Sequence, residues 1–219
     1  MIEVSNFKQI FTHQVIDTSG YATVNETDTQ ASITQLRIEG RGIDFHSLSA
    51  DFSKKLASDK LHTSSCHKDS DGIVLFEHSG IKYVLVCELK SGSGQFSEAM
   101  KQVVSSYLDF CEAFSLCDGF DIDDYQVFFF ITATKNGRYD TWLNSISMKR
   151  RTMPLSFHES IIWDNFEHSI YSGSILSDPY THKVPSVYKK VFINKSVSIV
   201  FRTAPDNTST ITVDINSLI

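Results

Sequence analysis

The stretch SDGIVLFEHSGIKYVLVCELKSG, residues 70–92, constrains the fold more than any other part of the sequence. Its apolar residues form two runs of strand length, 72–77 and 82–89. Between the runs, Ser79 and Gly80 suit a two-residue turn, because such turns favour small residues and glycine. The stretch therefore predicts a β-hairpin that belongs to the core of the protein.

A two-residue turn would pair His78 with Ile81, and counting on from this pair places Asp71 directly opposite Glu88. A bulged three-residue turn would shift the pairing by one residue. Side chains two residues apart in a strand share a face, so Lys90 projects on the same side as Glu88. Two carboxylates this close repel each other, and a hard cation such as Mg²⁺ between them would remove the conflict. The open end of the hairpin is a candidate metal site, where Lys90 could stabilise a developing negative charge.

Two alternatives stay open for this hairpin end. An acid followed two residues later by a lysine is also common at solvated strand ends, where it has no chemical role. If the register slips, Asp69 takes the place of Asp71. His67 lies near the motif and is a weaker candidate for a contact with phosphate or metal.

Five further segments have the patterns of regular secondary structure. They are a strand over 31–40 ended by Gly40, an amphipathic helix over 47–60, a helix over 96–114, a buried central strand over 125–133 and a helix over 140–151. This order predicts an α/β fold with a mixed central β-sheet flanked by helices.

The ends of the chain have less regular patterns. Residues 1–30 are polar and form an N-terminal lead-in segment that is long enough for one or two short strands. Residues 31–153 form the predicted core. Residues 154–219 form a C-terminal extension packed on the core. Within it, strands over 196–204 and 209–219 flank a turn-like Pro-Asp-Asn-Thr, which predicts a second β-hairpin.

Charge and cysteine content limit the classes of partner. The formal net charge is −6, so a polyanion partner would need a local basic patch. No apolar run reaches the roughly 18 residues of a membrane span, and the N-terminus has no signal-peptide pattern. The four cysteines have no metal-site spacing. We expect a cytoplasmic protein with free thiols and no membrane partner.

Two basic runs are the candidates for such a patch. The first consists of Lys149, Arg150 and Arg151, and the second of Lys189 and Lys190. Basic runs are usually solvated faces, but in an acidic protein they are the places where a nucleic-acid backbone could bind.

An acid at the start of one strand, a Glu-x-Lys triplet at the end of the next and a helix after them resemble the PD-(D/E)xK nuclease superfamily. The resemblance covers residues 69–107. It implies a restriction-endonuclease-like core and cleavage of nucleic acid with Mg²⁺, for which Mn²⁺ can substitute. By position, Asp71 and Glu88 match the two metal-binding acids, the Leu89 carbonyl matches a further metal ligand, and Lys90 matches the catalytic lysine.

The helix after the triplet resembles that of the RecB-like branch of the superfamily. Gln102 matches the glutamine of that branch, which we count among the catalytic residues. In the branch a tyrosine follows the glutamine by four residues, whereas here that place holds Ser106 and the tyrosine is Tyr107. Lys101 is a rival to Gln102 and a candidate contact for nucleic acid. A further acid often comes from the first helix of the superfamily, and Asp51 is the candidate.

The resemblance implies an enzyme that hydrolyses phosphodiester bonds, with DNA as the expected substrate, in restriction, repair or defence against phage. The expected nucleic-acid contacts are Lys101, Lys149, Arg150 and Arg151. The alternative is a non-catalytic interaction subunit of a larger complex that keeps a nuclease-like fold, which the acidic balance suits. A homodimer and a partner subunit both stay open.

Overall fold

The computed structural model describes residues 15–49, 70–90, 96–115, 117–134, 152, 175–178, 197–204 and 208–219. Its strands form one sheet in the order β1-β2-β3-β4-β5-β7-β6, with β8 beside β2. The strands are β1 (Val15–Asn25), β2 (Gln35–Ser49), β3 (Gly72–His78), β4 (Ile81–Lys90), β5 (Tyr125–Thr134), β6 (Ile175–Asp178), β7 (Val197–Ala204) and β8 (Thr210–Asp214). The helical elements are α3 (Phe96–Phe114) and the short 3₁₀ helices η1 (Ile122–Asp124) and η3 (Ile215–Ser217).

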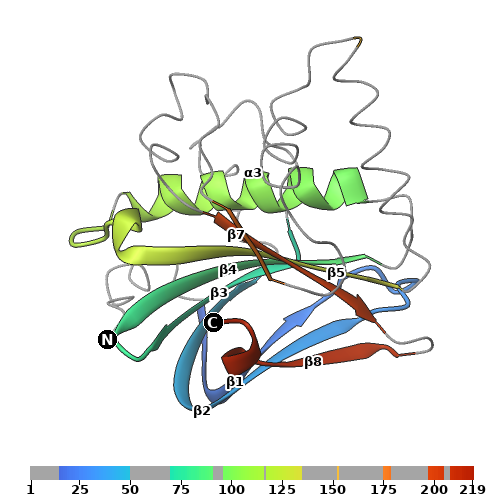
Figure 1. Ribbon diagram of the computed structural model, residues 1–219, viewed down its shortest axis with the longest axis horizontal. Coiled ribbons are helices and arrows are strands. Elements are labelled where there is room, and N and C mark those ends of the chain that lie inside the picture. Colours follow the sequence, from blue (N-terminus) through green and yellow to red (C-terminus); the bar gives the residue numbers. More distant parts are fainter. Residues whose placement is uncertain are drawn as a thin grey trace.

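The sheet is mixed, as the sequence predicts for an α/β protein. Strands β1, β2, β3 and β4 run antiparallel to one another in turn. After β4 the chain passes through α3 and returns as β5, which is parallel to β4. A parallel neighbour requires such a crossover, and a helix is the usual one. Figure 1 shows α3 lying along the sheet where β4 and β5 run side by side.

The predictions for α3 and β5 are confirmed. The helix occupies residues 96–114, and Glu98 lies in its first turn, where the helix dipole favours an acid. Strand β5 lies between β4 and β7. Its residues 127–132 are all buried, which explains why they are apolar almost without interruption.

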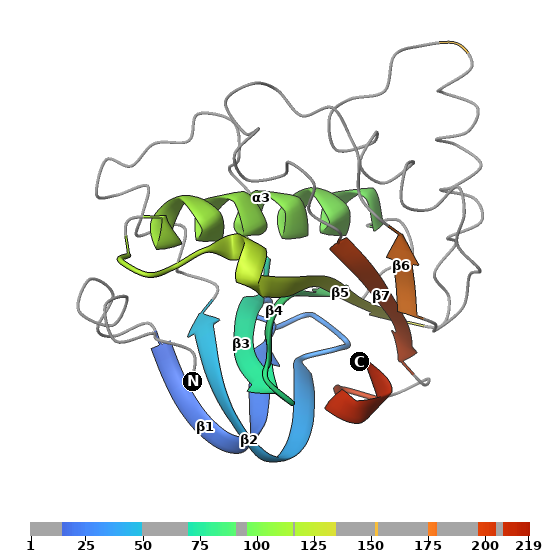
Figure 2. The ribbon, with the colours of Figure 1, turned by 60° about the vertical axis from the view of Figure 1, so that its left-hand side comes forward.

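The central sheet has two buried faces. Tyr107 of α3 packs against Phe129 of β5, with ring centroids 5.7 Å apart, on the face that α3 covers. The opposite face closes over a hydrophobic core that β1, β2, β8 and η3 complete (Figures 1 and 2). This core includes Ala22, Val24, Leu36, Ile38, Phe45, Val74, Phe76, Leu85, Cys87, Leu89, Phe128, Phe130, Ile211, Val213 and Ile215.

Strand β2 is long and bent, so two predictions for its residues are wrong. We expected a strand to end at Gly40, but β2 continues to Ser49. The bend occurs where residues 40–43 lie opposite the register shift of β1 between Ser19 and Tyr21. Gly40 makes it possible, because a β-carbon there would lie 2.7 Å from the Ile43 side chain.

The second wrong prediction is the start of the helix over 47–60. Residues 47–49 are the last residues of β2, and Ser47 pairs with Ile16 of β1 and Val74 of β3. The four-residue spacing of Leu48 and the apolar residues after it resembles a helix, but pairing with two strands decides the local structure. Residues 50–60 lie outside the described part of the chain.

Replacing Gly42 by alanine should destabilise the protein. Gly42 has φ +76° with no atom within 4 Å of an added β-carbon, so the cost comes from backbone strain alone. We expect the free energy of unfolding to fall by about 1–2 kcal/mol. Urea unfolding would measure the change, with the exposed neighbour Arg41→Ala as the control. An equal effect of both substitutions would contradict the role of the positive φ at Gly42.

The predicted C-terminal hairpin is wrong, although both strands exist. Strand β7 pairs with β5 in parallel and with β6 in antiparallel orientation, whereas β8 pairs with β2. A strand buried like β5 needs hydrogen-bond partners on both edges, and β7 supplies the second edge. Strand β8 instead places Ile211 and Val213 in the core. A short polar turn between two strands is compatible with this crossing as well as with a hairpin.

Several predictions lie outside the described residues or are not tested by them. The helix over 140–151 lies outside, and the boundaries at residues 30 and 153 stay predictions. A strand within residues 1–30 is confirmed as β1. Among the described helices, none has the length and apolar character needed to span a membrane. Among the described cysteines, Cys87, Cys111 and Cys117 are buried and do not form disulfides.

Candidate metal and catalytic site

The β3–β4 hairpin has the predicted register. His78 pairs with Ile81 and, at the other end, Gly72 pairs with Cys87. Ser79 and Gly80 have φ values of 53° and 79°, and two positive values are what a type I′ turn requires. Continuing this register by one residue brings Asp71 opposite Glu88, so both acids lie where these two strands end.

The ladder between β3 and β4 changes its hydrogen bonding just beyond Gly72. Leu89 and Ser70 would form the next hydrogen-bonded pair, with two backbone bonds between them. Instead, the Leu89 N–H donates to Asp71 Oδ2 at 2.6 Å. The Ser70 N–H donates to Ser106 Oγ of α3 at 2.7 Å. Side chains therefore replace both backbone bonds of this pair.

This exchange removes the donor that the Leu89 carbonyl would have in a continued ladder. The N–H and C=O of one strand residue point to the same neighbouring strand, so this carbonyl points toward the start of β3, where its N–H meets Asp71. Its ladder donor there would be the Ser70 N–H, which is bonded to Ser106. The carbonyl can thus serve as an oxygen ligand beside the Asp71 carboxylate.

Glu88 is enclosed, which rules out the alternative of a solvated strand end. Its side chain is 0% exposed, and that of Lys90 is 14% exposed. Lys90 Nζ forms an ion pair with Glu88 Oε1. Glu88 Oε2 has no hydrogen-bond partner among the described residues. A buried carboxylate oxygen without a partner is costly, so this position favours the binding of a cation or of a hydrogen-bond donor.

Burial dominates the electrostatics of both acids. Burial raises the pKa of Asp71 to about 7, although the hydrogen bond from the Leu89 N–H lowers this pKa. The pKa of Glu88 is raised well above its usual value, first by burial and then by the charge of Asp71, whereas Lys90 lowers it. In the metal-free protein both acids therefore hold their protons to a higher pH than ordinary carboxyl groups do.

Sequence analysis missed a third acid, Glu26, which follows β1. Its charge raises the pKa of Asp71 and that of Glu88. Glu26 Oε1 accepts hydrogen bonds from the N–H groups of Thr27 and Asp28, at 2.8 and 3.0 Å. No local motif marks this residue, because its approach to Asp71 depends on how β1 packs on β3.

The site residues fit a divalent cation. Two carboxylates and one backbone carbonyl are hard oxygen ligands, and Mg²⁺ usually keeps several waters beside so few protein ligands. A cation there would neutralise both acids and supply the missing partner of Glu88 Oε2. In the described part of the chain, no three His, Cys, Asp or Glu side chains gather closely enough to hold an ion by themselves.

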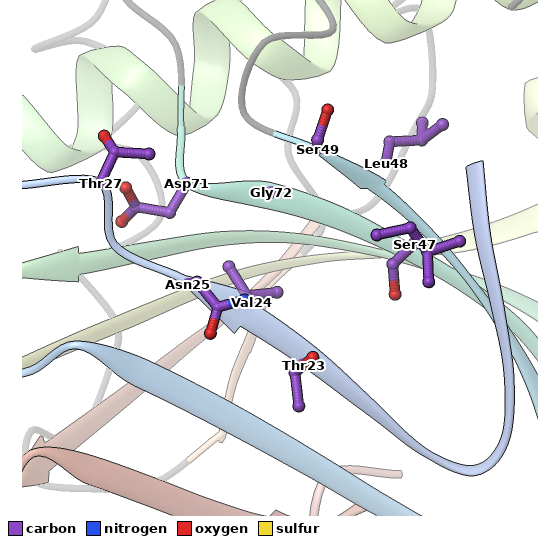
Figure 3. A pocket seen from close by; sticks show the side chains of 10 residues that line it. Thr23, Val24, Asn25, Thr27, Ser47, Leu48, Ser49, Asp71 and Gly72 are labelled. Carbon is purple, nitrogen blue, oxygen red and sulfur yellow. The ribbon is translucent and has the colours of Figure 1, made fainter. Parts of the chain in front are cut away.

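Asp71 also borders a pocket of about 180 Å³ between β1, β2 and the start of β3. Figure 3 shows Asp71 beside Thr27 at this pocket, with Val24 and Gly72 nearby. The close fit of β1 against β3 depends on Gly72, because an added β-carbon would lie 3.1 Å from Val24. The pocket gives Asp71 an opening that the enclosed Glu88 lacks.

Helix α3 presents the remaining described candidate to the same region. Gln102 is half-buried and precedes Ser106 by four residues, so both lie on one face of α3. Because Ser106 bonds to Ser70, this face lies against the start of β3. Tyr107, in contrast, is fully buried against the sheet as a core residue.

Other predicted site residues lie outside what the structure describes, and their roles stay predictions. The candidates near the motif are Asp51, His67, Asp69 and the side chain of Lys101. The structure likewise does not describe either basic run, so it does not bring these residues to the site or place them away from it. They are Lys149, Arg150, Arg151, Lys189 and Lys190.

A comparison of the chain with protein-family models, with curated proteins and with solved structures gives no match. The resemblance to the PD-(D/E)xK superfamily therefore rests on the quoted motif alone.

The raised pKa of Asp71 predicts how stability depends on pH. A carboxyl whose pKa is higher in the folded than in the unfolded protein stabilises the fold fully below the unfolded value. That stabilisation is lost as pH rises from about 4 to about 7. Asp71 should account for a loss on the order of 4 kcal/mol at most over this range, and Glu88, whose pKa is also raised, should add to the loss. Urea unfolding in EDTA at several pH values would measure it.

Asp71→Asn should flatten this pH dependence, because asparagine keeps an acceptor for the Leu89 N–H but does not titrate. The matched control is Asp44→Asn, at an exposed position of β2. An unchanged pH slope in Asp71→Asn would show that Asp71 titrates normally in the folded protein.

Proposed function

We propose that this protein is a Mg²⁺-dependent nuclease of the PD-(D/E)xK type that hydrolyses phosphodiester bonds, with DNA as its expected substrate. The observation that carries the proposal is Glu88, which is fully buried, ion-paired with Lys90 and has one oxygen without a hydrogen-bond partner among the described residues. A buried carboxylate with an unsatisfied oxygen is unfavourable, and acids with strongly perturbed pKa values cluster at functional sites.

The order of the elements supports the same proposal. Asp71 precedes β3, the Glu88–Lys90 triplet ends β4, and α3 follows before β5 returns parallel to β4. This is the order of acid, triplet and helix on which the resemblance rests. The register of the hairpin, continued by one residue, places Asp71 opposite Glu88 of the triplet.

Each residue has a defined task in this chemistry. Mg²⁺, when bound, would lower the pKa of a water and neutralise charge on the scissile phosphate. Asp71, Glu88 and the Leu89 carbonyl would hold it, and the Leu89 N–H fixes the orientation of Asp71. Lys90 would donate to a phosphate oxygen or to the attacking water as negative charge develops.

Gln102 and the basic residues would act on the substrate strand. Gln102 would orient the water or the phosphate from α3. The ion must bind first, because the carboxylates otherwise repel the phosphate. Contacts with backbone phosphates would follow, and such contacts weaken as salt concentration rises. The residues that would make them are Lys101, Lys149, Arg150 and Arg151.

The test is cleavage of supercoiled plasmid, linear duplex, single-stranded DNA and RNA by the purified protein. We expect cutting of DNA with Mg²⁺ or Mn²⁺ and none with EDTA. Cutting that persists in EDTA would contradict a metal-dependent mechanism. If no substrate is cut or bound with any ion, the non-catalytic interaction subunit becomes the better interpretation.

A further inference from the structure

We propose that Ser106 is a positioning residue that holds the start of β3 away from β4 and thereby leaves the Leu89 carbonyl free to bind the metal. This inference rests on the proposed function, because it assigns a task to a residue that touches neither the ion nor the substrate. The RecB-like branch has a tyrosine at this helix position, whereas here Ser106 forms a hydrogen bond with the start of β3.

The hairpin register shows what Ser106 prevents. By the pairing from His78↔Ile81 to Gly72↔Cys87, Ser70 should pair with Leu89 through two backbone hydrogen bonds. The ladder could continue here, because no proline or bulge interrupts it. It stops because the Ser70 N–H donates to Ser106 Oγ at 2.7 Å.

The second half of the exchange depends on the first. With Ser70 turned toward α3, its carbonyl no longer accepts from the Leu89 N–H, and Asp71 Oδ2 accepts instead at 2.6 Å. The same contact therefore orients the Asp71 carboxylate and frees the Leu89 carbonyl. Both groups are the ones that the proposed site needs next to Glu88.

Burial makes the Ser106 hydroxyl decisive for this arrangement. Ser70 is 3% exposed and Ser106 is 5% exposed, so water does not readily replace the bond between them. A buried N–H without an acceptor is costly. Without the hydroxyl, the nearest acceptor in the ladder for the Ser70 N–H is the Leu89 carbonyl, and that bond would occupy the metal ligand.

The experiment measures ion binding rather than activity. Isothermal titration with Mn²⁺ would compare the wild type with Ser106→Ala, Ser106→Thr and Ser105→Ala. Ser105 is a matched control, because it is a buried serine next in the helix but turned by about 100° around its axis. We expect about tenfold weaker binding in Ser106→Ala, near-normal binding in Ser106→Thr, which keeps the hydroxyl, and normal binding in Ser105→Ala.

A second readout needs no metal. The backbone carbonyl ¹³C shift of Leu89, measured in EDTA, should move in Ser106→Ala as the Ser70 N–H bonds to it, and should stay in place in Ser106→Thr. Normal Mn²⁺ affinity with an unmoved Leu89 signal in folded Ser106→Ala would overturn the proposal. So would equal losses in Ser105→Ala and Ser106→Ala, because these would indicate a general packing effect.

The outcomes separate this inference from the proposed function. Ion binding that depends on Ser106 in a protein that cuts no nucleic acid would support the positioning role and reject the nuclease. Metal-dependent cutting with Ser106→Ala unchanged in affinity and Leu89 shift would support the nuclease and reject the positioning role.

Discussion

Glu88→Gln is expected to abolish cleavage and to stabilise the metal-free protein at neutral pH. Cleavage should fall on the order of 10³-fold, because loss of a ligand removes several kcal/mol of charge stabilisation in the transition state. Stability should rise by about 1 kcal/mol, or 2–4 °C in Tm, because a fully buried acid beside Asp71 is removed. Lys90 keeps Asp71 as a partner for its charge.

A plasmid-cutting assay and a thermal melt in EDTA would measure the two effects. Glutamine is the right replacement, because Glu88 fills a buried position and alanine would leave a cavity. The control is Glu39→Gln, which removes an exposed acid on β2 that pairs with Arg37. A Glu88→Gln protein that is less stable and still cuts would show that Glu88 is a structural partner of Lys90.

Lys90→Met is expected to lose most cleavage while binding Mg²⁺ at least as tightly as the wild type. Cleavage should fall about 10²–10³-fold, the usual cost of removing one donor to a developing charge. Ion affinity should not fall, because the substitution removes a positive charge that neutralises Glu88 and competes with the cation. Single-turnover cleavage and isothermal titration would separate the two effects.

Lys82→Met is the matched control for this prediction. Lys82 lies on the same strand but at its other end, where it pairs with Asp124 at 3.3 Å. Equal losses of cleavage from both substitutions would point to overall charge. Weaker Mg²⁺ binding in Lys90→Met would mean that Lys90 helps the two acids to bind the ion and does not act on the developing charge.

Local signals in the sequence are sufficient to predict the elements that frame the site. The two-residue turn at Ser79 and Gly80 sets the register of β3 and β4, because pairing next to a tight turn leaves little freedom. The bounds of α3 follow from its apolar spacing. The register that, continued by one residue, places Asp71 opposite Glu88 is therefore predictable from the amino-acid sequence.

Other features depend on contacts between distant parts of the chain, which a single sequence does not encode in a readable pattern. The sequence between the C-terminal strands is typical of a turn, but burial of β5 and β2 decides their partners. Glu26 approaches Asp71 because β1 packs on β3. Ser106 looks like a departure from a motif in the sequence, and its bond to Ser70 depends on how α3 lies on the sheet.

The most direct test of the account is anomalous diffraction from Mn²⁺ in crystals of this protein, compared between the wild type and Glu88→Gln. We expect a peak in the wild type at coordination distance from Asp71, Glu88 and the Leu89 carbonyl, and a lost or much weaker peak in Glu88→Gln. A Mn²⁺ concentration that supports cutting but leaves no peak between these three groups would contradict it.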